Sequence, residues 1–303
     1  MTETTATTET TATPLTWTGE RCVPWAPDYQ VIYEHYHRYL WAATLLAPGS
    51  KVLDLASGEG YGSQLLAALG HTVTGVEFDP AAVAHAKNTY PDVTFEAGDM
   101  RKLGDHLADF DAVICFEALE HIVEHDDLIA GVRKVLKPGG LFVVSTPDKD
   151  VYGGHSHGEA HHDEHDHSAN PFHLRELNLP EFQEFLGQAF AHVDVFEQRF
   201  AVGSVISGLT TSSGASTQRG LAQTDGGWQQ AAIPPATYLL GVASNNPLPS
   251  KAGSDLLLDG EITAVRSLHG RVQQLERQLE LAAGYRGTLI YRGLRRGYHL
   301  VRK

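Results

Sequence analysis

Apolar and polar residues alternate with two different periods along the first half of the chain. Short apolar runs begin near residues 51, 71, 93, 111 and 141, and segments with helical spacing of apolar residues separate them. Strands that alternate with helices predict a parallel sheet covered by helices on both faces. The runs are almost continuously apolar, as expected for strands buried on both sides. The expected fold class is therefore α/β and doubly wound.

The boundaries of the expected elements follow from this pattern and from turn residues. Pro48-Gly49 ends the first helix, Asp79-Pro80 starts a later one, and Lys137–Gly140 is expected to form a turn. The expected helices cover residues 28–46, 60–69, 79–88, a stretch ending at 136, and 179–190. The expected strands cover residues 51–55, 71–77, 93–97, 111–116, 141–145, 193–200 and 237–243.

Composition divides the chain into a body and its appendages. Residues 1–18, rich in Thr, Ala and Glu, are expected to be a disordered tail, and residues 19–248 the folded domain. Within that domain we expect a histidine-rich insertion at 152–170 and a flexible loop at 203–230, which is rich in Ser, Thr, Gly and Gln. Residues 255–303 are expected to form a helical, basic extension.

The C-terminal extension predicts contact with a partner. Apolar residues spaced by three and four form the seam of a short coiled coil, which favours a homo-oligomer; they are Val265, Leu268, Val272, Leu275, Leu279 and Ala282. Residues 284–303 carry six basic residues and no acidic one. Two interpretations remain for this basic end: contact with a membrane surface or an acidic partner, or folding onto the chain's own acidic body.

Charge and cysteine content limit the classes of function. The formal net charge of −14 disfavours a nucleic-acid binder, because phosphates would be repelled. The chain has two cysteines, Cys22 and Cys115, which are far apart and favour a cytoplasmic location over a disulfide scaffold. It has no run of about eighteen apolar residues.

A glycine-rich turn follows the first expected strand. Its sequence from Asp54 to Gly62, DLASGEGYG, lets the backbone approach a ligand closely. A dinucleotide-binding turn would have a third glycine at Ser63. The carboxylate of Asp54 would repel a pyrophosphate and suits an ammonium or sulfonium ligand. Glu77 and Asp99, at the ends of the next two strands, can bind ribose hydroxyls and an adenine.

Five segments in this order resemble those of the class I methyltransferases that use S-adenosylmethionine. They are Val52–Gly62, Val76-Glu77, Gly98-Asp99, Phe110–His121 and Leu136–Leu141. The resemblance covers about residues 20 to 200 and implies a Rossmann-like, mostly parallel seven-stranded sheet whose last strand is antiparallel. It also implies S-adenosylmethionine as the methyl donor. Ala56 stands where the family usually has its first glycine, which is tolerable if its φ is negative.

The resemblance also implies which residues bind the donor. Asp54, Gly58 and Gly60 would face the methionine part, and Glu77 the ribose. Asp99 and Met100 would face the adenine, and Phe116 the sulfur. On the first helix, Tyr33, His37 and Arg38 would close over the donor, or else pack in the core.

The acceptor side needs a group that activates a hydroxyl, since an aliphatic hydroxyl is a poor nucleophile at neutral pH. His121 and His173 are the candidate bases, because the ordinary pKa of histidine suits this role. Glu117 is a third candidate, which would orient the hydroxyl. For His121 the alternative is that it only packs or caps within its helix.

The histidine-rich tract has six histidines between His155 and His167. One interpretation is a metal site, because His157, His161 and His165 would share a helix face. The other is a mobile lid over the active site, which we favour because the tract lacks cysteines and apolar anchors. No residue is therefore assigned to a metal.

The predicted function is O-methylation of a sugar, a glycan or a glycosylated natural product. The segment Gly19–Pro24, the helix around Tyr33–Tyr39 and the C-terminal seam resemble those of methyltransferases in glycan pathways. Alternatives are a methyltransferase for a quinone, polyketide or amine, and a non-catalytic scaffold that acts through the coiled coil. The expected partner is a small-molecule or glycan acceptor, without nucleic acid.

Overall fold

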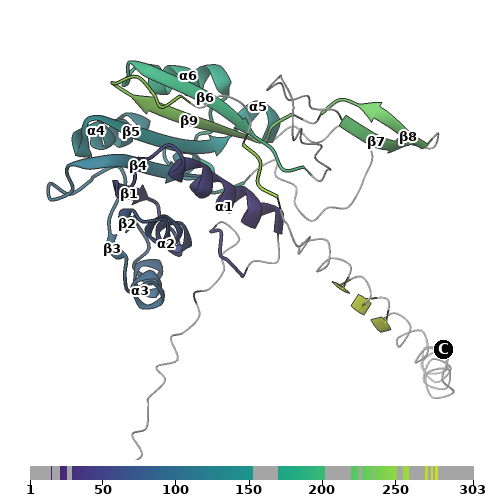
Figure 1. The fold of residues 1–303 in the computed structure, drawn as a ribbon, viewed down its shortest axis with the longest axis horizontal. Coiled ribbons are helices and arrows are strands. Elements are labelled where there is room, and N and C mark those ends of the chain that lie inside the picture. The colour runs from purple at the N-terminus through teal and green to yellow at the C-terminus, as the bar shows by residue number, and fades with distance from the viewer. Residues whose placement is uncertain are drawn as a thin grey trace, which may run out of the picture. The chain divides into compact units, whose positions relative to one another are not determined.

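Seven strands form one sheet in the order β3–β2–β1–β4–β5–β9–β6 (Figure 1). Their bounds are β1 Lys51–Leu55, β2 Thr72–Glu77, β3 Thr94–Ala97, β4 Phe110–Phe116, β5 Leu136–Pro147, β6 His192–Gln198 and β9 Tyr238–Ser244. The first five pair in parallel, and β9 runs antiparallel to both β5 and β6. The prediction of a mostly parallel sheet whose last strand is antiparallel is confirmed.

The computed structural model describes only part of the chain. The described residues are 15, 21–25, 29–152, 170–201, 220–224, 227–233, 235–250, 255–258, 270–271, 274–275 and 277–278. The chain divides into two units, residues 1–255 with the sheet and residues 256–303. The predicted tail (apart from Leu15), residues 153–169 of the histidine-rich insertion and most of the C-terminal extension lie outside the described residues.

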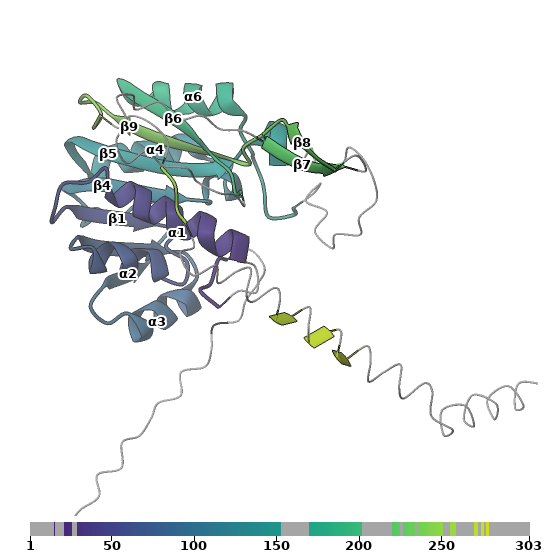
Figure 2. The same ribbon diagram turned by 45° about the vertical axis from the view of Figure 1, so that its right-hand side comes forward.

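Helices cover both faces of the sheet (Figure 2). On one face α1 (Tyr29–Ala43), α2 (Tyr61–Ala68) and α3 (Pro80–Thr89) enclose a core with strand residues such as Val52 and Ile114. On the other face η1 (Leu119–His121), α4 (His125–Val135) and α6 (Leu179–Gly187) enclose a core around Leu53 and Val113. Adjacent strand residues thus point to opposite cores, which explains the continuous apolar runs. The short helix α5 (Lys149–Tyr152) follows β5.

Helix starts follow the capping residues in the sequence. The Asp79 side chain accepts a hydrogen bond of 2.9 Å from the backbone N–H of Ala81 and so caps α3, as the Asp-Pro pair predicts. Asn178 and Glu181 form a reciprocal capping box at the start of α6.

Several segments differ from the predicted elements. The single helix predicted up to Leu136 is divided into η1 and α4, and α5 was not predicted. Lys137–Gly140, predicted as a turn that precedes the strand, lies inside β5. The pairing register of β5 with β4 shifts at this point, between Phe110 and Ala112 of β4. A bulge there accommodates the Pro-Gly-Gly sequence without ending the strand, and Gly139 takes a φ of 77°. The end of the predicted loop 203–230 forms a hairpin of β7 (Gly220–Thr224) and β8 (Gly227–Ala231). Gly227, with a φ of 97°, begins the second strand directly after the turn.

The strand order reverses between β1 and β4, which are neighbours in the sheet but not in the sequence. In open α/β sheets the carboxyl ends of the strands at such a point leave a crevice where ligands bind. The loops that follow Leu55 and Phe116 therefore border the expected binding site.

Candidate functional site

The glycine-rich turn after β1 takes backbone conformations that side chains disfavour. Ala56, Gly58 and Gly60 have φ values of 54°, 58° and 100°. A Cβ at Gly60 would lie 2.9 Å from the Phe95 ring, so this position needs glycine for packing as well. The expectation of a negative φ at Ala56 is wrong, because the turn is left-handed already at its first residue.

Asp54 lies on β1 and is fully buried beneath this turn. Its carboxylate accepts hydrogen bonds from the Tyr39 hydroxyl (3.1 and 3.3 Å) and from the Ser63 hydroxyl (2.6 Å). Burial raises the pKa of the Asp54 carboxyl to about 7, although both hydrogen bonds act to lower it. A cationic group bound nearby would favour the charged carboxylate.

Glu77 ends β2 and joins the turn to the start of α3. Its carboxylate accepts the backbone N–H of Gly58 (2.9 Å) and that of Asp79 (3.0 Å). Arg21 donates to Asp79 at 3.0 Å and lies 3.8 Å from Glu77. Glu77 is therefore held in place by the same turn that is expected to bind the ligand.

Asp99 and Met100 follow β3, the third strand with an acidic residue near its carboxyl end. The Arg101 backbone N–H and guanidinium donate to Asp99 at 2.8–3.2 Å, and the guanidinium also binds Glu124. These hydrogen bonds lower the pKa of Asp99. Met100 is half-buried against the core, so the pair offers a carboxylate next to an apolar side chain.

Three aromatic and basic residues predicted at the donor lie at different depths. Phe116 is buried and packs edge-on against Tyr39, with ring centroids 5.0 Å apart. Tyr33 stacks on Phe200 at 6.3 Å. Arg38 is 1% exposed; its Nε donates to Gln198 (2.7 Å) and its guanidinium lies over the Tyr238 ring. Arg38 thus contacts β6 and β9.

Glu117 directly follows β4 and has a φ of 49°. Its backbone N–H donates to the carbonyl and the hydroxyl of Ser145, and the Ser145 hydroxyl donates to its carboxylate at 2.6 Å. The Arg38 guanidinium lies 3.6 Å from the same carboxylate. Among the described residues neither terminal nitrogen of Arg38 has a hydrogen-bond partner. The Glu117 side chain is 14% exposed.

Both predicted histidines lie together beyond Glu117. The rings of His121 in η1 and His173 are 5.2 Å apart, although 51 residues separate them. The carboxylate of Glu120 belongs to the same group, since one ligand atom from each of the three residues lies within 4.8 Å of the others. Burial raises the pKa of the Glu120 carboxyl, and the nearby Glu117 raises it further.

Residues 46–184 match the sequence profile of a family described as a methyltransferase domain. A protein of Mycolicibacterium smegmatis, named as a probable S-adenosylmethionine-dependent methyltransferase, is 35% identical over 191 residues, 60% of this chain and 67% of that protein. The chain belongs to the class I S-adenosylmethionine-dependent methyltransferases. It spans about two thirds of the length of that relative.

Further similarities differ in extent. A ubiquinone biosynthesis O-methyltransferase of Xanthomonas campestris pv. campestris is 34% identical over 110 residues, 35% of this chain and 46% of that enzyme. The crystal structure of a TehB-like S-adenosylmethionine-dependent methyltransferase from Corynebacterium glutamicum aligns with a TM-score of 0.43 and 14% identity, over 73% of this chain and 100% of that chain.

The donor of this methyltransferase is S-adenosylmethionine, and the turn side of the site fits its chemistry. Carboxylates near the ends of three adjacent strands suit its ammonium, its ribose hydroxyls and its adenine amine. The buried hydroxyl of Ser57, in the turn itself, has no hydrogen-bond partner among the described residues. A polar group of the donor could satisfy it.

Three residues at the candidate site were not singled out in the sequence. Arg21 reaches Asp79 from the N-terminal segment, and only the fold brings them together, 58 residues apart. Glu120 is part of the quoted segment Phe110–His121, but its burial beside His173 has no local signal. Glu59 in the turn is also buried; it accepts from the Tyr90 hydroxyl and bonds His85, so it supports the turn from α3.

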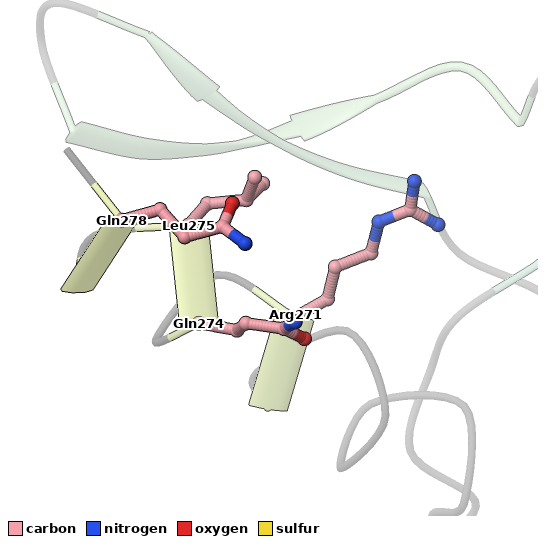
Figure 3. A pocket seen from close by; sticks show the side chains of 4 residues that line it. All are labelled: Arg271, Gln274, Leu275 and Gln278. Carbon is pink, nitrogen blue, oxygen red and sulfur yellow. The ribbon is translucent and has the colours of Figure 1, made fainter. Parts of the chain in front are cut away.

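The second unit contains a hollow of about 490 Å³ lined by Arg271, Gln274, Leu275 and Gln278 (Figure 3). All four lining residues come from one short stretch of the sequence, and they do not provide the convergent polar groups of a ligand site. Among the described residues, no helix has the length and apolarity needed to cross a bilayer.

Proposed function

We propose that this methyltransferase transfers the methyl group to a hydroxyl oxygen of a sugar, a glycan or a glycosylated natural product. The observation that carries the proposal is the group Glu117, Glu120, His121 and His173, which follows the strand bordering the donor crevice. A hydroxyl must lose its proton to become a good nucleophile, whereas a neutral amine already has a free electron pair. Groups able to assist that loss favour an oxygen acceptor.

The donor side of the proposed site follows the residue pattern of the family. We assign the methionine part to Asp54, Gly58 and Gly60, and the ribose to Glu77. Asp99 and Met100 are assigned to the adenine, and Phe116 is assigned to the sulfur side. Tyr33 and Arg38 belong to the helix that is proposed to cover the donor. S-adenosylmethionine supplies the methyl group; the chain positions it opposite the acceptor oxygen and excludes water.

The proposed sugar or glycoside acceptor rests on the resemblance of the N-terminal segment to methyltransferases of glycan pathways. Apolar side chains near the histidines are compatible with it: Phe172 and Leu174 flank His173 and are 56% and 61% exposed. Such surfaces pack against the apolar faces of sugar rings or an aglycone.

A second candidate is the hydroxyl of a quinone precursor. This candidate is favoured by the similarity to the ubiquinone biosynthesis O-methyltransferase, although that similarity extends over only 35% of this chain. The site would then bind a phenolic hydroxyl, which loses its proton more readily than a sugar hydroxyl does.

Product analysis with a mixed acceptor panel tests both candidates. The protein is incubated with S-adenosylmethionine and with nucleotide sugars, glycosides, catechols and amines, and products are identified by mass spectrometry and NMR. We expect an O-methyl group on a sugar or glycoside. Methylated catechols alone would favour the second candidate, and methylation of amines alone would contradict oxygen transfer.

Glu77→Ala is the control variant for donor binding in this panel. Loss of charge-assisted hydrogen bonds to the ribose should weaken donor binding by about 10- to 100-fold in calorimetry. Glu96→Ala, on the outer strand β3 beside the exposed His106, should leave donor binding unchanged. Equal donor affinities of the Glu77 variant and the parent would contradict the placement of the ribose.

A further inference from the structure

On the acceptor side of the site, three side chains of the types that bind metals lie on two segments that backbone hydrogen bonds join. Glu120 and His121 belong to η1, and His173 to the segment Asn170–Glu176 that returns beside it. The Glu120 carbonyl accepts the backbone N–H groups of Leu174 (2.7 Å) and Arg175 (3.1 Å). These bonds hold the two segments side by side, so the position of His173 relative to η1 does not depend on side-chain contacts alone.

Both histidines have one ring nitrogen engaged by an acceptor. Nδ1 of His121 lies 3.0 Å from the Phe172 carbonyl oxygen, and Nδ1 of His173 lies 2.5 Å from the Glu176 carboxylate. A carbonyl oxygen can only accept, so Nδ1 of His121 carries the proton, and the carboxylate favours the same tautomer of His173. In the neutral ring, Nε2 is then the nitrogen with the electron pair. Histidines that bind metals typically have this arrangement, with the second nitrogen donating to a carbonyl or carboxylate.

Glu120 has its carboxylate in the protein interior, where a negative charge loses its hydration and is unfavourable. It is 1% exposed, and the side-chain hydrogen bond that its carboxylate receives comes from Thr146 at 3.2 Å. The guanidinium of Arg38 forms its ion pair with Glu117, and its charge also favours the Glu120 carboxylate, although more weakly than burial opposes it. A buried carboxylate needs a cation or a proton to offset its lost hydration. A metal cation is the one group that this carboxylate and the two nearby imidazoles could bind together.

We propose that Glu120, His121 and His173 bind one divalent transition-metal ion. Two imidazole nitrogens and one carboxylate oxygen suit Zn²⁺, Mn²⁺, Co²⁺ or Fe²⁺ better than Mg²⁺ or Ca²⁺, which prefer oxygen ligands. Three protein ligands leave a coordination position open, as catalytic metal sites do. The sequence assigned no residue to a metal, and this site differs from the histidine-rich tract at 155–167.

The role of the metal rests on the proposed function, whereas metal binding does not. An acceptor hydroxyl at the open position would have its pKa lowered by the ion and release its proton to solvent. One electron pair of the oxygen then forms the bond to the methyl carbon, and the pair of the carbon–sulfur bond stays on sulfur. No redox change occurs. A histidine that binds the ion through Nε2 cannot act as the base, so the proposal replaces the predicted base role of both histidines.

Metal titration of the full chain without a histidine tag tests the site. Calorimetry with ZnCl₂ and MnCl₂, and the visible absorption of the Co²⁺ form, are compared for the parent, Glu120→Gln, His121→Asn and His173→Asn. We expect one high-affinity ion per chain and at least about tenfold weaker binding in each variant. The Co²⁺ spectrum should change with each variant, which loss of a purely structural contact would not produce.

Two controls separate this site from other histidines. His106→Asn removes an exposed histidine that pairs with Glu96. A variant with His161→Ser and His162→Ser removes two histidines of the tract. Both should bind the ion as the parent does. Binding that is unchanged in the three ligand variants, or that is lost only in the tract variant, would overturn the proposal.

The folding of each variant and its methyl-transfer activity are measured separately. Circular dichroism melting shows whether each variant is folded, and Glu176→Gln keeps all three ligands while weakening the partner of His173, so it should lower affinity with an intact fold. Donor titration and the acceptor panel report on methyl transfer. Tight metal binding without any O-methylated product would support the metal site and contradict the proposed function. O-methylation without metal binding would support the proposed function and contradict the metal site.

Discussion

Two residues that border the site have backbone conformations that cost energy. Ala56 and Glu117 follow β1 and β4 directly, and both have positive φ without being glycine. Each such conformation costs about 1–3 kcal/mol and persists because the surroundings hold it. For Glu117 the surroundings are the carbonyl and hydroxyl of Ser145. The strain therefore lies at the point of the sheet where donor and acceptor are expected to meet.

Asp54 gives the fold a measurable pH dependence. Its pKa rises from 3.8 to about 7 on folding, so the folded chain binds the proton more tightly than the unfolded chain. The associated stability is complete below pH 4 and is lost as the pH rises through 7. In urea unfolding without donor, the parent should lose up to about 4 kcal/mol between pH 4 and 8, at 1.36 kcal/mol per pKa unit, and Asp54→Asn should lose much less.

Asp111→Asn provides the control of opposite sign. Hydrogen bonds from Lys137 and from the Lys51 backbone lower the pKa of Asp111. Its contribution is present at neutral pH and lost as the pH falls through its pKa. Identical pH profiles of the parent and Asp54→Asn would show that the buried carboxyl titrates normally.

The predictions for single residues of the donor side rest on local signals. Asp54, Gly58 and Glu77 are recognisable from the turn and the strand ends, and the hydrogen bond between Gly58 and Glu77 places two of them together. The positive φ of Ala56 could not be predicted, since alanine normally avoids it. The group of Glu120 with His173 depends on a return of the chain after 50 residues, which no periodicity encodes.

The contact between α1 and α2 determines whether Asp54 is correctly held. Gly62 in α2 lies under the Tyr39 ring, and a Cβ there would lie 2.0 Å from the ring. Gly62→Ala should therefore displace Tyr39 from Asp54, destabilise the fold by about 1–3 kcal/mol and weaken donor binding. Thermal melting and donor calorimetry measure the two effects.

Gly187, the last residue of α6, is the matched helical control because nothing lies within 4 Å of its Cβ position. Gly187→Ala should leave donor binding unchanged and raise stability by about 0.5–1 kcal/mol. A Gly62 variant that behaves like the Gly187 variant would show that α1 can move away from α2 without consequence for the site.

Element types were predictable to a large extent, and the exceptions have physical causes. The strands β1, β2 and β9 lie within one residue of their predicted bounds, because both periodicity and turn residues mark them. The bulge in β5 resembles a turn, since Pro-Gly-Gly marks any departure from regular pairing. The hairpin β7–β8, with the sequences GLAQT and GWQQA, follows a stretch rich in Ser, Thr, Gly and Gln, so composition suggested a loop.

At the scale of the whole molecule the sheet-containing unit ends at Asp255, before the predicted seam. His37 of α1 bonds Asp255 at 2.9 Å, so the end of this unit is attached to its first helix. The predicted seam from Val265 to Ala282 spans about five helical turns and would be only marginally stable as an isolated helix, so its apolar stripe is expected to lie on another surface. We predict that it joins two copies of the chain.

Ending the chain after Asp259 tests this prediction. The truncated protein should bind the donor with unchanged affinity and sediment as a monomer where the parent sediments as a dimer. Its melting temperature should stay close to that of the parent because Asp255 is retained. A truncated chain that keeps the parent's oligomeric state and melts much lower would refute the dimer contact.

The backbone bonds from Leu174 and Arg175 to Glu120 have a consequence for how such an enzyme can evolve. They anchor the far end of the insertion, and Tyr152 at its near end packs against His173 with ring centroids 5.4 Å apart. The 17 residues from 153 to 169 thus join two fixed points. Since each doubling of a connecting loop costs only about 0.6 kcal/mol, natural variation can lengthen, shorten or exchange this segment without moving the reacting groups. New acceptors become accessible by changing this segment, while the groups at its two ends are inherited intact.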